Sequence, residues 1–420
     1  APAQQWLADA AQALAAAHAT ARAEVPQPAM ASDVPAATVA EPTAPAPPAY
    51  SRQNPLRATV RLNRLLNAPG ADKETRQHVF DLQGSGLHYA AGDALGVWPT
   101  NCPALVGDML TALKLAPSAA VQVKGHGDMP LSEALLRHME IARITPDLLR
   151  FVHERSGSDQ LTTLLRDDRK KELRQWLWGR QPIDLFQAFA MDCDAQALLG
   201  VLKPLQPRLY SIASSPKAHA GEVHLTVSTV RYACEGRARK GVCSTFLADR
   251  AGQAPAPIFV QKSAHFHPPH DPHAPMIMVG PGTGIAPFRG FLHDRQADGA
   301  SGRNWLFFGE QRAATDFYYR DELEAMLQNG TLHRLSTAFS RDQAEKIYVQ
   351  QRMREQGADL WAWLQEGAYF YVCGDASRMA KDVDAALLDI ARQHGGLDAD
   401  AARAYLDTLA RDKRYLRDVY

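Results

Sequence analysis

The sequence predicts a multi-domain protein of the β and α/β classes, in which an antiparallel β-barrel with a helical connecting insertion precedes a doubly wound parallel sheet. Alternation of apolar and polar residues, broken by turn signals, begins near Pro55 and returns after residue 207. Between these regions, residues from about 102 to 200 follow the helical period. After residue 275, short apolar runs alternate with helical segments, which is typical of a parallel sheet covered by helices.

Composition limits the class of protein and its partners. The 420 residues exceed one ordinary domain, and 46% hydrophobic with 22% charged residues is a globular profile. Basic and acidic residues number 46 each, so we expect no nucleic-acid partner, and anions must be bound by local clusters. No apolar run reaches the roughly 18 residues of a membrane span. Five scattered cysteines and no signal-peptide pattern predict a cytoplasmic protein with reduced thiols and no membrane partner.

The first 54 residues predict a helix followed by a linker. Residues 1–24 are Ala-rich, with Trp6, Leu7 and Leu14 on one apolar stripe. Residues 25–54 are rich in Pro and Ala and cannot bury a core. We therefore expect the helix to be the last one of a domain that is otherwise missing.

Residues 55–270 predict the barrel and its insertion. The turn signals APGAD and GSG separate the first strands, and the insertion occupies about 102–200. The expected strands are 56–66, 77–82, 92–98, 208–214 and 222–232, and the expected helices are 132–144, 146–157 and 170–180.

Residues 271–420 predict the parallel-sheet domain. HFHPPHDPH, residues 265–273, lies at the junction, and its three prolines favour an interdomain loop over a metal site. The expected strands are 275–280, 304–310, 332–340 and 368–375, with helices near 285–297, 316–328, 346–366 and 377–394.

A Gly-rich turn follows the first of these strands. In MIMVGPGTGIAPFRGF, Gly280, Gly282 and Gly284 would let the backbone approach a pyrophosphate, and Thr283 offers a hydroxyl at a helix N-terminus. A tight strand–helix turn without ligand is the alternative, because the spacing is not a full GxGxxG.

A basic cluster follows the third strand of the same sheet. AFSRDQAEKIYVQ supplies Ser340, Arg341 and Lys346, then Tyr348 and Gln350, at the edge where open α/β sheets bind ligands. Arginine binds phosphate bidentately, lysine adds charge, and tyrosine can stack on adenine. A solvated charged loop is the alternative. Together with the Gly-rich turn, the cluster favours NADP(H) with its adenosine 2′-phosphate.

Three further motifs can each be interpreted either as part of a ligand site or as ordinary structure. RLYS (208–211) is either a ligand strand or a half-exposed edge, and GVCS (241–244) opens either a diphosphate cradle or an ordinary capped helix. Cys373 in YVCGD ends a strand, where its thiol would reach the ligand crevice unless it is a small core residue.

These motifs, in this order, resemble the FAD/NADPH module of the diflavin reductases, which is ferredoxin-NADP reductase-like. The resemblance covers residues from about 55 to 420 and rests on RLYS, GVCS, GPGTGIAP, SR…KIYVQ, YVCGD and the aromatic C-terminus. SGLHYAAGDALGVW, NWLFFGE and the ending RDVY are most similar to the flavoprotein of assimilatory sulfite reductase. Two positions depart from the pattern: Cys243 stands in the Gly turn, and His267 replaces a usual arginine.

The resemblance implies an NADPH-dependent flavoprotein oxidoreductase. FAD would take hydride from NADPH and pass electrons through FMN, in the missing N-terminal domain, to a haemoprotein (beta) subunit that reduces sulfite. The alternatives are another diflavin reductase, similar to P450 reductase, and a non-catalytic nucleotide-binding scaffold.

The resemblance also implies roles for individual residues and no metal ligand. Ser211, Cys373 and Asp418 would surround the site of hydride transfer, and the terminal Tyr420 would stack on the flavin. The remaining FAD residues would be Arg208, Leu209, Tyr210, Thr226, Val227, Ser228, Tyr232, Gly241, Val242, Cys243 and Ser244. The NADPH residues would be Gly282, Thr283, Ser340, Arg341, Lys346, Ile347, Tyr348, Val349, Gln350 and Asp382.

Overall fold

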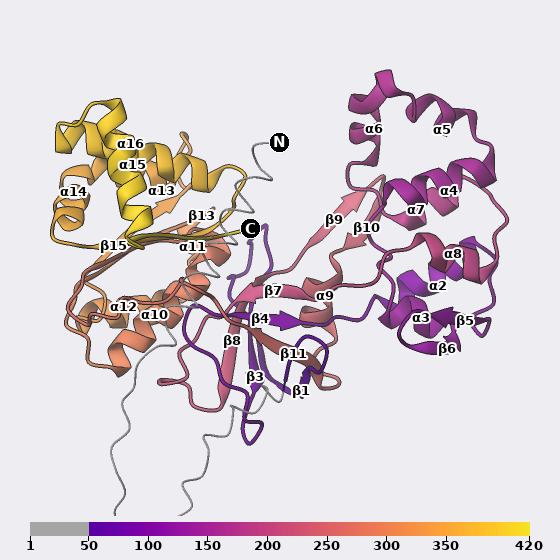
Figure 1. Cartoon of the computed structure of the whole chain (residues 1–420), viewed down its shortest axis with the longest axis horizontal. Helices are drawn as coiled ribbons and strands as arrows, with labels where there is room; N and C mark the ends of the chain where they lie inside the picture. Colours follow the sequence, from indigo (N-terminus) through magenta and orange to yellow (C-terminus); the bar gives the residue numbers. More distant parts are fainter. Residues whose placement is uncertain (1–49) are drawn as a thin grey trace, which may run out of the picture. The chain divides into compact units, whose positions relative to one another are not determined.

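The computed structural model describes residues 50–420 (Figure 1). The helix expected in 1–24 and nearly all of the expected linker lie outside the described residues. No helix in the described part of the chain has the length and apolar character needed to cross a membrane.

Two antiparallel sheets enclose the first core. One sheet has the order β1-β11-β4-β7 and the other β2-β3-β8, and a bridge between Ile212 and Leu225 joins them. Phe80 and Leu95 are fully buried in the core between the sheets, together with Ile212 and Leu225. The antiparallel pairing matches the prediction, whereas strand β11 was not predicted and closure into a barrel stays a prediction. Their bounds are β1 Leu56–Ala58, β2 Val60–Leu65, β3 Thr75–Asp81, β4 Ala94–Val97, β7 Arg208–Ser211, β8 Glu222–Ser228 and β11 Ala256–Gln261.

A hairpin and one helix complete this region. The hairpin pairs β9 (Arg231–Cys234) with β10 (Arg237–Lys240) and leads directly into α9 (Val242–Asp249). Helix α9 begins at Val242 with Gly241 as its N-cap, as the GVCS motif predicts.

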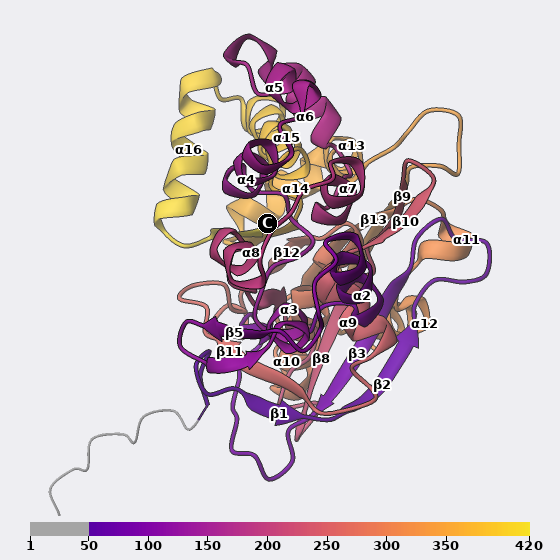
Figure 2. The ribbon, with the colours of Figure 1, turned by 90° about the vertical axis from the view of Figure 1, so that its right-hand side faces the viewer.

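The helical insertion has a hydrophobic core of its own and lies on the side of the antiparallel sheets away from the parallel sheet (Figures 1 and 2). Helix α4 shows why it forms: Thr145 caps its first turn, Leu148 and Val152 lie on the buried face, and Gly157 ends it with φ of 59°. A small hairpin, β5–β6, was not predicted. The bounds are α2 Pro103–Ala112, β5 Ala120–Val123, β6 Gly127–Pro130, α3 Leu131–Arg137, α4 Pro146–Ser156, α5 Asp159–Leu164, η1 Asp167–Arg169, α6 Lys170–Leu177, α7 Pro182–Ala188 and α8 Ala195–Val201.

The C-terminal half is a parallel five-stranded sheet with the order β14-β13-β12-β15-β16. On the central strand, Ile277 and Val279 belong to one core and Met276 and Met278 to another, because alternate side chains face opposite sides of a sheet. Helices α10–α12 cover one face and α13–α16 the other (Figure 1). The strands are β12 Met276–Val279, β13 Asn304–Glu310, β14 Arg334–Phe339, β15 Tyr369–Gly374 and β16 Tyr415–Val419.

The helices of this half depart from the prediction at several points. Two helices, α11 and α12, stand where one was expected near 316–328, and two more, α13 and α14, stand where one was expected at 346–366. Neither α16 nor strand β16 was predicted. The bounds are η2 Gly282–Gly284, α10 Ile285–Ala297, α11 Ala313–Asp316, α12 Arg320–Gln328, α13 Val349–Glu355, α14 Gly357–Gln365, α15 Met379–Gly395 and α16 Ala399–Arg411.

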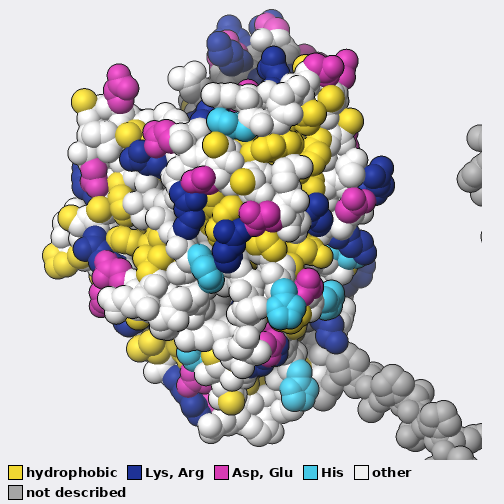
Figure 3. Space-filling model, turned by 90° about the vertical axis from the view of Figure 1, so that its left-hand side faces the viewer, with side chains coloured by type: hydrophobic (Ala, Val, Ile, Leu, Met, Phe, Trp, Pro, Cys, Tyr) yellow, Lys and Arg dark blue, Asp and Glu magenta, His cyan; other side chains and the backbone are white. Residues whose placement is uncertain are grey.

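Charges are mixed on the outer face of this half. Figure 3 shows basic and acidic side chains interspersed there, without a broad patch of one sign. This distribution agrees with the equal numbers of basic and acidic residues in the sequence. An anion must therefore be bound by a local cluster of basic side chains.

Candidate active site

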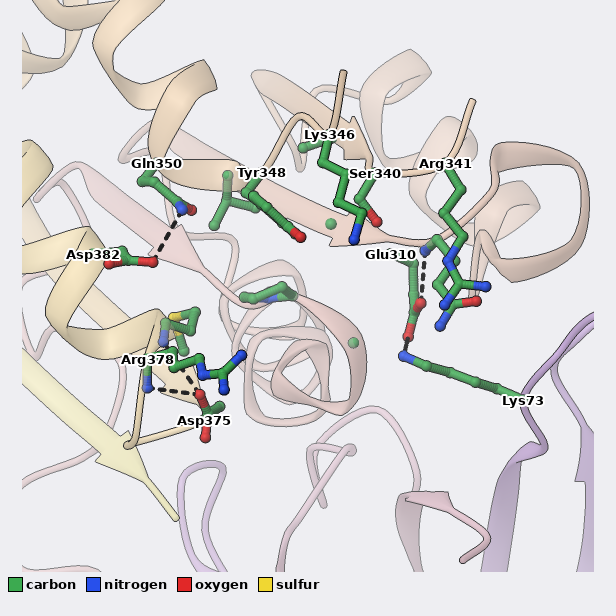
Figure 4. Close-up of a pocket in the computed structure, with 17 residues that line it drawn as sticks. Lys73, Glu310, Ser340, Arg341, Lys346, Tyr348, Gln350, Asp375, Arg378 and Asp382 are labelled. Carbon is green, nitrogen blue, oxygen red and sulfur yellow. Dashed lines mark hydrogen bonds and ion pairs between the residues drawn. The ribbon is translucent and has the colours of Figure 1, made fainter. Parts of the chain in front are cut away.

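A pocket of about 570 Å³ lies at the carboxyl ends of the parallel strands (Figure 4). This is the edge at which open α/β sheets bind ligands. We call it the nucleotide pocket. Of the residues predicted for NADPH, Gly282, Ser340, Arg341, Lys346, Tyr348, Val349, Gln350 and Asp382 line it. The other lining residues are Lys73, Pro281, Gly309, Glu310, Gln311, Ala338, Asp375, Arg378 and Met379.

The stretch 346–350 alternates between pocket and core. Lys346, Tyr348 and Gln350 are at the pocket, and the Tyr348 ring is 45% exposed. Ile347 packs against the hydrophobic core, and Val349 is buried there with only its edge at the pocket. Ile347 therefore supports the site without lining it.

Asp382 and Gln350 are brought together from different helices. The side-chain amide of Gln350 donates to Asp382 Oδ2 at 3.3 Å (Figure 4). This contact joins the start of α13 to the start of α15, and it fixes one end of the pocket.

Among the lining residues that the sequence analysis did not predict, four are charged: Lys73, Glu310, Asp375 and Arg378. Figure 4 shows Arg378 and Lys346 reaching into the pocket from opposite walls. Glu310 is the last residue of β13, and Asp375 and Arg378 follow β15. All three could have been identified because open α/β sheets bind ligands at the carboxyl ends of their strands. Lys73 lies in the loop between β2 and β3, far away in sequence, and no local signal points to it.

Asp375 organises the loop that carries Arg378. It accepts hydrogen bonds from the hydroxyl of Ser377 and from the backbone N–H groups of Arg378 and Met379. These hydrogen bonds lower the pKa of Asp375 to about 2, and the bond from the Ser377 hydroxyl contributes most. The ionised carboxylate thus holds the loop while the Arg378 side chain points into the pocket.

The Gly-rich turn is shaped mainly by packing. A Cβ on Gly280 would lie 2.6 Å from the ring of Phe288, and one on Gly284 would lie 2.2 Å from the carbonyl oxygen of Cys373. Of the three glycines in this turn, Gly282 alone lines the nucleotide pocket, and its φ of 59° favours glycine. Close packing therefore accounts for Gly280 and Gly284, whereas Gly282 leaves the backbone open to a ligand.

Ser211, Cys373 and Asp418 meet at one point, and we call them the Ser211 cluster. The Ser211 hydroxyl donates to Asp418 Oδ2 at 2.5 Å, and Cys373 Sγ lies 3.8 Å from the same oxygen. Strand β16 places Asp418 directly beside Cys373 in the parallel ladder. Burial, followed by the charge of Asp418, raises the pKa of Cys373 well above its usual value, so the thiol is neutral.

The C-terminal residue is ordered and lies over this region. The N–H of Tyr420 donates to the carbonyl of Gly374 at 3.1 Å, and the N–H of Ala376 donates to the carbonyl of Tyr420 at 3.1 Å. The Tyr420 and Thr283 hydroxyls are 2.9 Å apart. Thr283 thus contacts the tail rather than the nucleotide pocket, and the Tyr420 ring stays 64% exposed.

Two family models match the chain in the same order as its two halves. Residues 48–246 match the model described as FAD binding domain, and residues 278–385 match the model described as oxidoreductase NAD-binding domain. The chain thus contains one region similar to FAD-binding domains and another similar to oxidoreductase NAD-binding domains. The nucleotide pocket and the Gly-rich turn lie mainly in the second matched region, and RLYS and GVCS lie in the first.

Curated relatives share almost all of the described region. The sulfite reductase [NADPH] flavoprotein alpha-component of Mannheimia succiniciproducens is 47% identical over 372 residues, which is 88% of this chain and 62% of the relative. The proteins of the same name from Shewanella oneidensis and Bacillus subtilis are 46% and 45% identical, each over 88% of this chain and 61% and 62% of their own lengths. The chain thus spans about three fifths of these relatives.

The strand RLYS exposes part of the predicted FAD surface. Leu209 is 53% exposed, and Arg208 is paired at 3.6 Å with Glu140 from the helical insertion. Tyr210 packs partly against the antiparallel core. Tyr232, on the β9–β10 hairpin, is also exposed. These apolar and aromatic surfaces fit a flat ring system, because a bound flavin would remove them from water.

Two predicted FAD residues on β8 are buried in protein contacts. The Thr226 hydroxyl lies 2.7 Å from the hydroxyl of Tyr319, and Val227 is buried in the antiparallel core. Their side chains are therefore directed at protein, which leaves backbone groups for a cofactor. Ser228, at the end of the strand, is exposed.

The start of α9 opens on a second pocket, of about 320 Å³. Gly241 and Val242 line it together with Arg237 and Lys240, so helix N–H groups and two cations face the same space. This arrangement fits a diphosphate.

The two remaining residues of GVCS are directed inward. The Ser244 hydroxyl accepts from the Val230 N–H at 3.1 Å. Cys243 is buried in the antiparallel core, and burial raises the pKa of its thiol to about 12. The unusual thiol therefore lies away from the predicted cradle.

The histidine-rich junction contacts both halves of the described chain, and the hydroxyl of Tyr371 on β15 donates to the carbonyl of His267 at 2.8 Å. The ring nitrogens of His267 lie 2.9 Å from the carbonyl of Ala91 and 3.0 Å from that of Ser263. These contacts fit the predicted interdomain loop and leave no free nitrogen on His267 for a metal.

Proposed function

We propose that the chain is the FAD- and NADPH-binding part of an NADPH-dependent sulfite reductase flavoprotein. The observation that carries this proposal is the nucleotide pocket, in which Ser340, Arg341 and Lys346 gather beside the aromatic ring of Tyr348. The names of the relatives support the sulfite reductase assignment over another diflavin reductase.

The pocket would distinguish NADPH from NADH at the 2′ position. A phosphate monoester carries a charge of about −1.5 to −2 at pH 7, which arginine and lysine bind strongly. Arg341 and Lys346 would bind it together with the Ser340 hydroxyl, and Tyr348 would stack on the adenine. Arg378, on the opposite wall, would face the pyrophosphate.

Bound FAD would supply the acceptor for the two electrons of a nicotinamide and the donor of single electrons to a later carrier. The Ser211 hydroxyl orients Asp418, and the carboxylate places negative charge where positive charge develops on a nicotinamide. The neutral thiol of Cys373 fills the space between them without adding charge. Tyr420 covers the cluster and must move aside for a nicotinamide to approach.

The remaining parts of the system belong to this proposal as well. The FAD-binding domain would span 55–270 with its insertion at about 102–200, and the NADP(H)-binding domain 271–420. FMN would pass electrons to a haemoprotein subunit, and the protein would work in the cytoplasm.

Anaerobic titration tests the proposal directly. The chain, purified with FAD, should be bleached by NADPH at micromolar concentrations and by NADH only at much higher ones. Reduction of sulfite should then require the FMN domain and the haemoprotein together. Failure to bind FAD, or equal bleaching by both nucleotides, would contradict the proposal, and transfer to a P450 instead of the haemoprotein would favour the other diflavin reductases.

A further inference from the structure

A loop from the FAD-binding half reaches into the nucleotide pocket. This loop joins β2 to β3, and its residues Asp72 and Lys73 make ion pairs with the other half of the molecule. Lys73 Nζ lies 2.7 Å from Glu310 Oε1, and Asp72 Oδ2 lies 2.7 Å from a guanidinium nitrogen of Arg341. The arginine predicted to bind the 2′-phosphate is therefore already paired with a carboxylate.

The loop is fixed in this position by contacts with α11. The N–H of Ala68 donates to the carbonyl of Thr315 at 2.9 Å, and the side-chain amide of Asn67 donates to Asp316 Oδ1 at 2.7 Å. Asn67 and Asp316 are both buried. Asp72 is thus held near Arg341 by the architecture of the interface and does not depend on the ion pair alone.

Asp72 has a second partner that would keep it in place. Its Oδ2 atom also lies 2.9 Å from a guanidinium nitrogen of Arg312. The hydrogen bond from Arg312 is the main cause of the lowered pKa of Asp72, and the charge of Arg341 contributes less. Arg312 can therefore hold the ionised carboxylate when Arg341 turns to another anion.

We propose that Asp72 sets the affinity for the 2′-phosphate by competing with it for Arg341. This inference rests on the proposed function, in which Arg341 binds the 2′-phosphate of NADPH. Before binding, Asp72 occupies Arg341; on binding, the phosphate takes Arg341, and Asp72 stays on Arg312. A nucleotide with a 2′-hydroxyl leaves the Asp72–Arg341 pair intact.

The charges and exposure favour this exchange. The side chains of Asp72 and Arg341 are 54% and 44% exposed, and such exposed ion pairs are weak. A phosphate carries more charge than a carboxylate and offers arginine a bidentate contact. The 2′-phosphate therefore displaces Asp72 from Arg341. Because the ion pair must be broken, the phosphate binds less tightly than it would to an unpaired arginine. The weaker binding speeds release of the oxidised nucleotide.

Calorimetry on the flavin-loaded chain tests the competition, with 2′,5′-ADP as the probe. Asp72→Asn should tighten 2′,5′-ADP binding by about two- to fivefold at low salt, as expected when an exposed ion pair is removed. The gain should shrink as salt screens the charges. The matched control is Asp359→Asn, because Asp359 pairs with Arg334 at 2.7 Å and lies outside the pocket.

A double-mutant cycle separates competition from a general effect on the fold. In the Arg341→Ala background, Asp72→Asn should leave 2′,5′-ADP binding unchanged. Asp72→Ser is a second variant in case Asp72→Asn loses its flavin. Unchanged or weaker binding in the single variant, or the same gain without Arg341, would overturn the inference. Absence of 2′,5′-ADP binding to the wild-type chain would instead overturn the proposed function.

Discussion

The nucleotide pocket and the Ser211 cluster obtain their side chains from the sequence in different ways. The phosphate-binding groups of the pocket come mostly from one stretch, 340–350, at the end of β14. Ser211 and Asp418 are 207 positions apart, yet they meet through a hydrogen bond between β7 and β16. A contiguous stretch can be read as a local motif, whereas a site assembled from distant strands exists only once the sheets are formed.

The same contrast separates binding from chemistry. The pocket is polar, partly exposed and rich in charges, which suits recognition of a phosphate. The Ser211 cluster is a carboxylate with a hydroxyl and a buried neutral thiol, which suits stabilisation of a transient charge in a dry site. We therefore expect changes in the pocket to alter nucleotide preference and changes in the cluster to alter the rate of flavin reduction.

The largest expected effect is on the Ser211 cluster. Asp418→Asn removes the negative charge but keeps the shape, and it should slow flavin reduction by NADPH about 100-fold. Stopped-flow bleaching of the flavin measures this rate, and FAD content should stay at the wild-type level. Asp412→Asn, an exposed carboxylate just before β16, is the control. A wild-type rate in Asp418→Asn would remove the cluster from the mechanism.

The next effect is on the nucleotide pocket. Arg341→Ala should lower the NADPH/NADH ratio of kcat/KM by about 10- to 100-fold, because a charge-assisted contact to the 2′-phosphate is lost. The rate at saturating NADPH should change little. Arg334→Ala, which removes an arginine of similar exposure outside the pocket, should keep the wild-type ratio. If both variants behave alike, the ratio reports stability rather than recognition.

The same contrast between contiguous and distant residues explains which parts of the fold and the site could be predicted from the sequence. The gathering of Lys346, Tyr348 and Gln350 at the pocket follows from one local motif, and so do most strands of the two halves. Strand β16 was missed because Arg417 and Asp418 make it resemble a polar tail, and its pairing partner lies on β15. The tail is ordered because that pairing exists.

Other misses have a similar cause. Lys73 and Asp72 act through contacts between the two halves, and no local period reveals such contacts. For Gly280 and Gly284 the sequence left both ligand approach and a tight turn open, and a Cβ there would meet Phe288 and the backbone of Cys373. Close packing and ligand approach both require glycine, and the sequence cannot separate them.

Tyr420 connects the two regions, and its removal should have an intermediate effect. Deleting Tyr420 should shift the NADPH/NADH preference toward NADH by about tenfold. The nicotinamide of either nucleotide must displace the ring, and only NADPH has 2′-phosphate binding to offset that displacement. Steady-state kcat/KM for both nucleotides measures the shift. Tyr420→Phe keeps the ring and loses only the contact with the Thr283 hydroxyl, so its ratio should stay within about twofold of wild type.

The smallest expected effect is a difference in pH dependence between the two regions. The second pKa of a phosphate monoester is about 6, so KM for NADPH should rise as pH falls through 6 and the 2′-phosphate loses charge. The raised pKa of Cys373 keeps its thiol protonated at pH 7 and also at pH 9, so the thiol adds no charge to the cluster over this range. The rate of flavin reduction at saturating NADPH should therefore change less than about twofold from pH 7 to 9. An inflection near pH 8.5 that disappears in Cys373→Ala would show that the thiol ionises, and the cluster would then bind a proton as well as stabilise a charge.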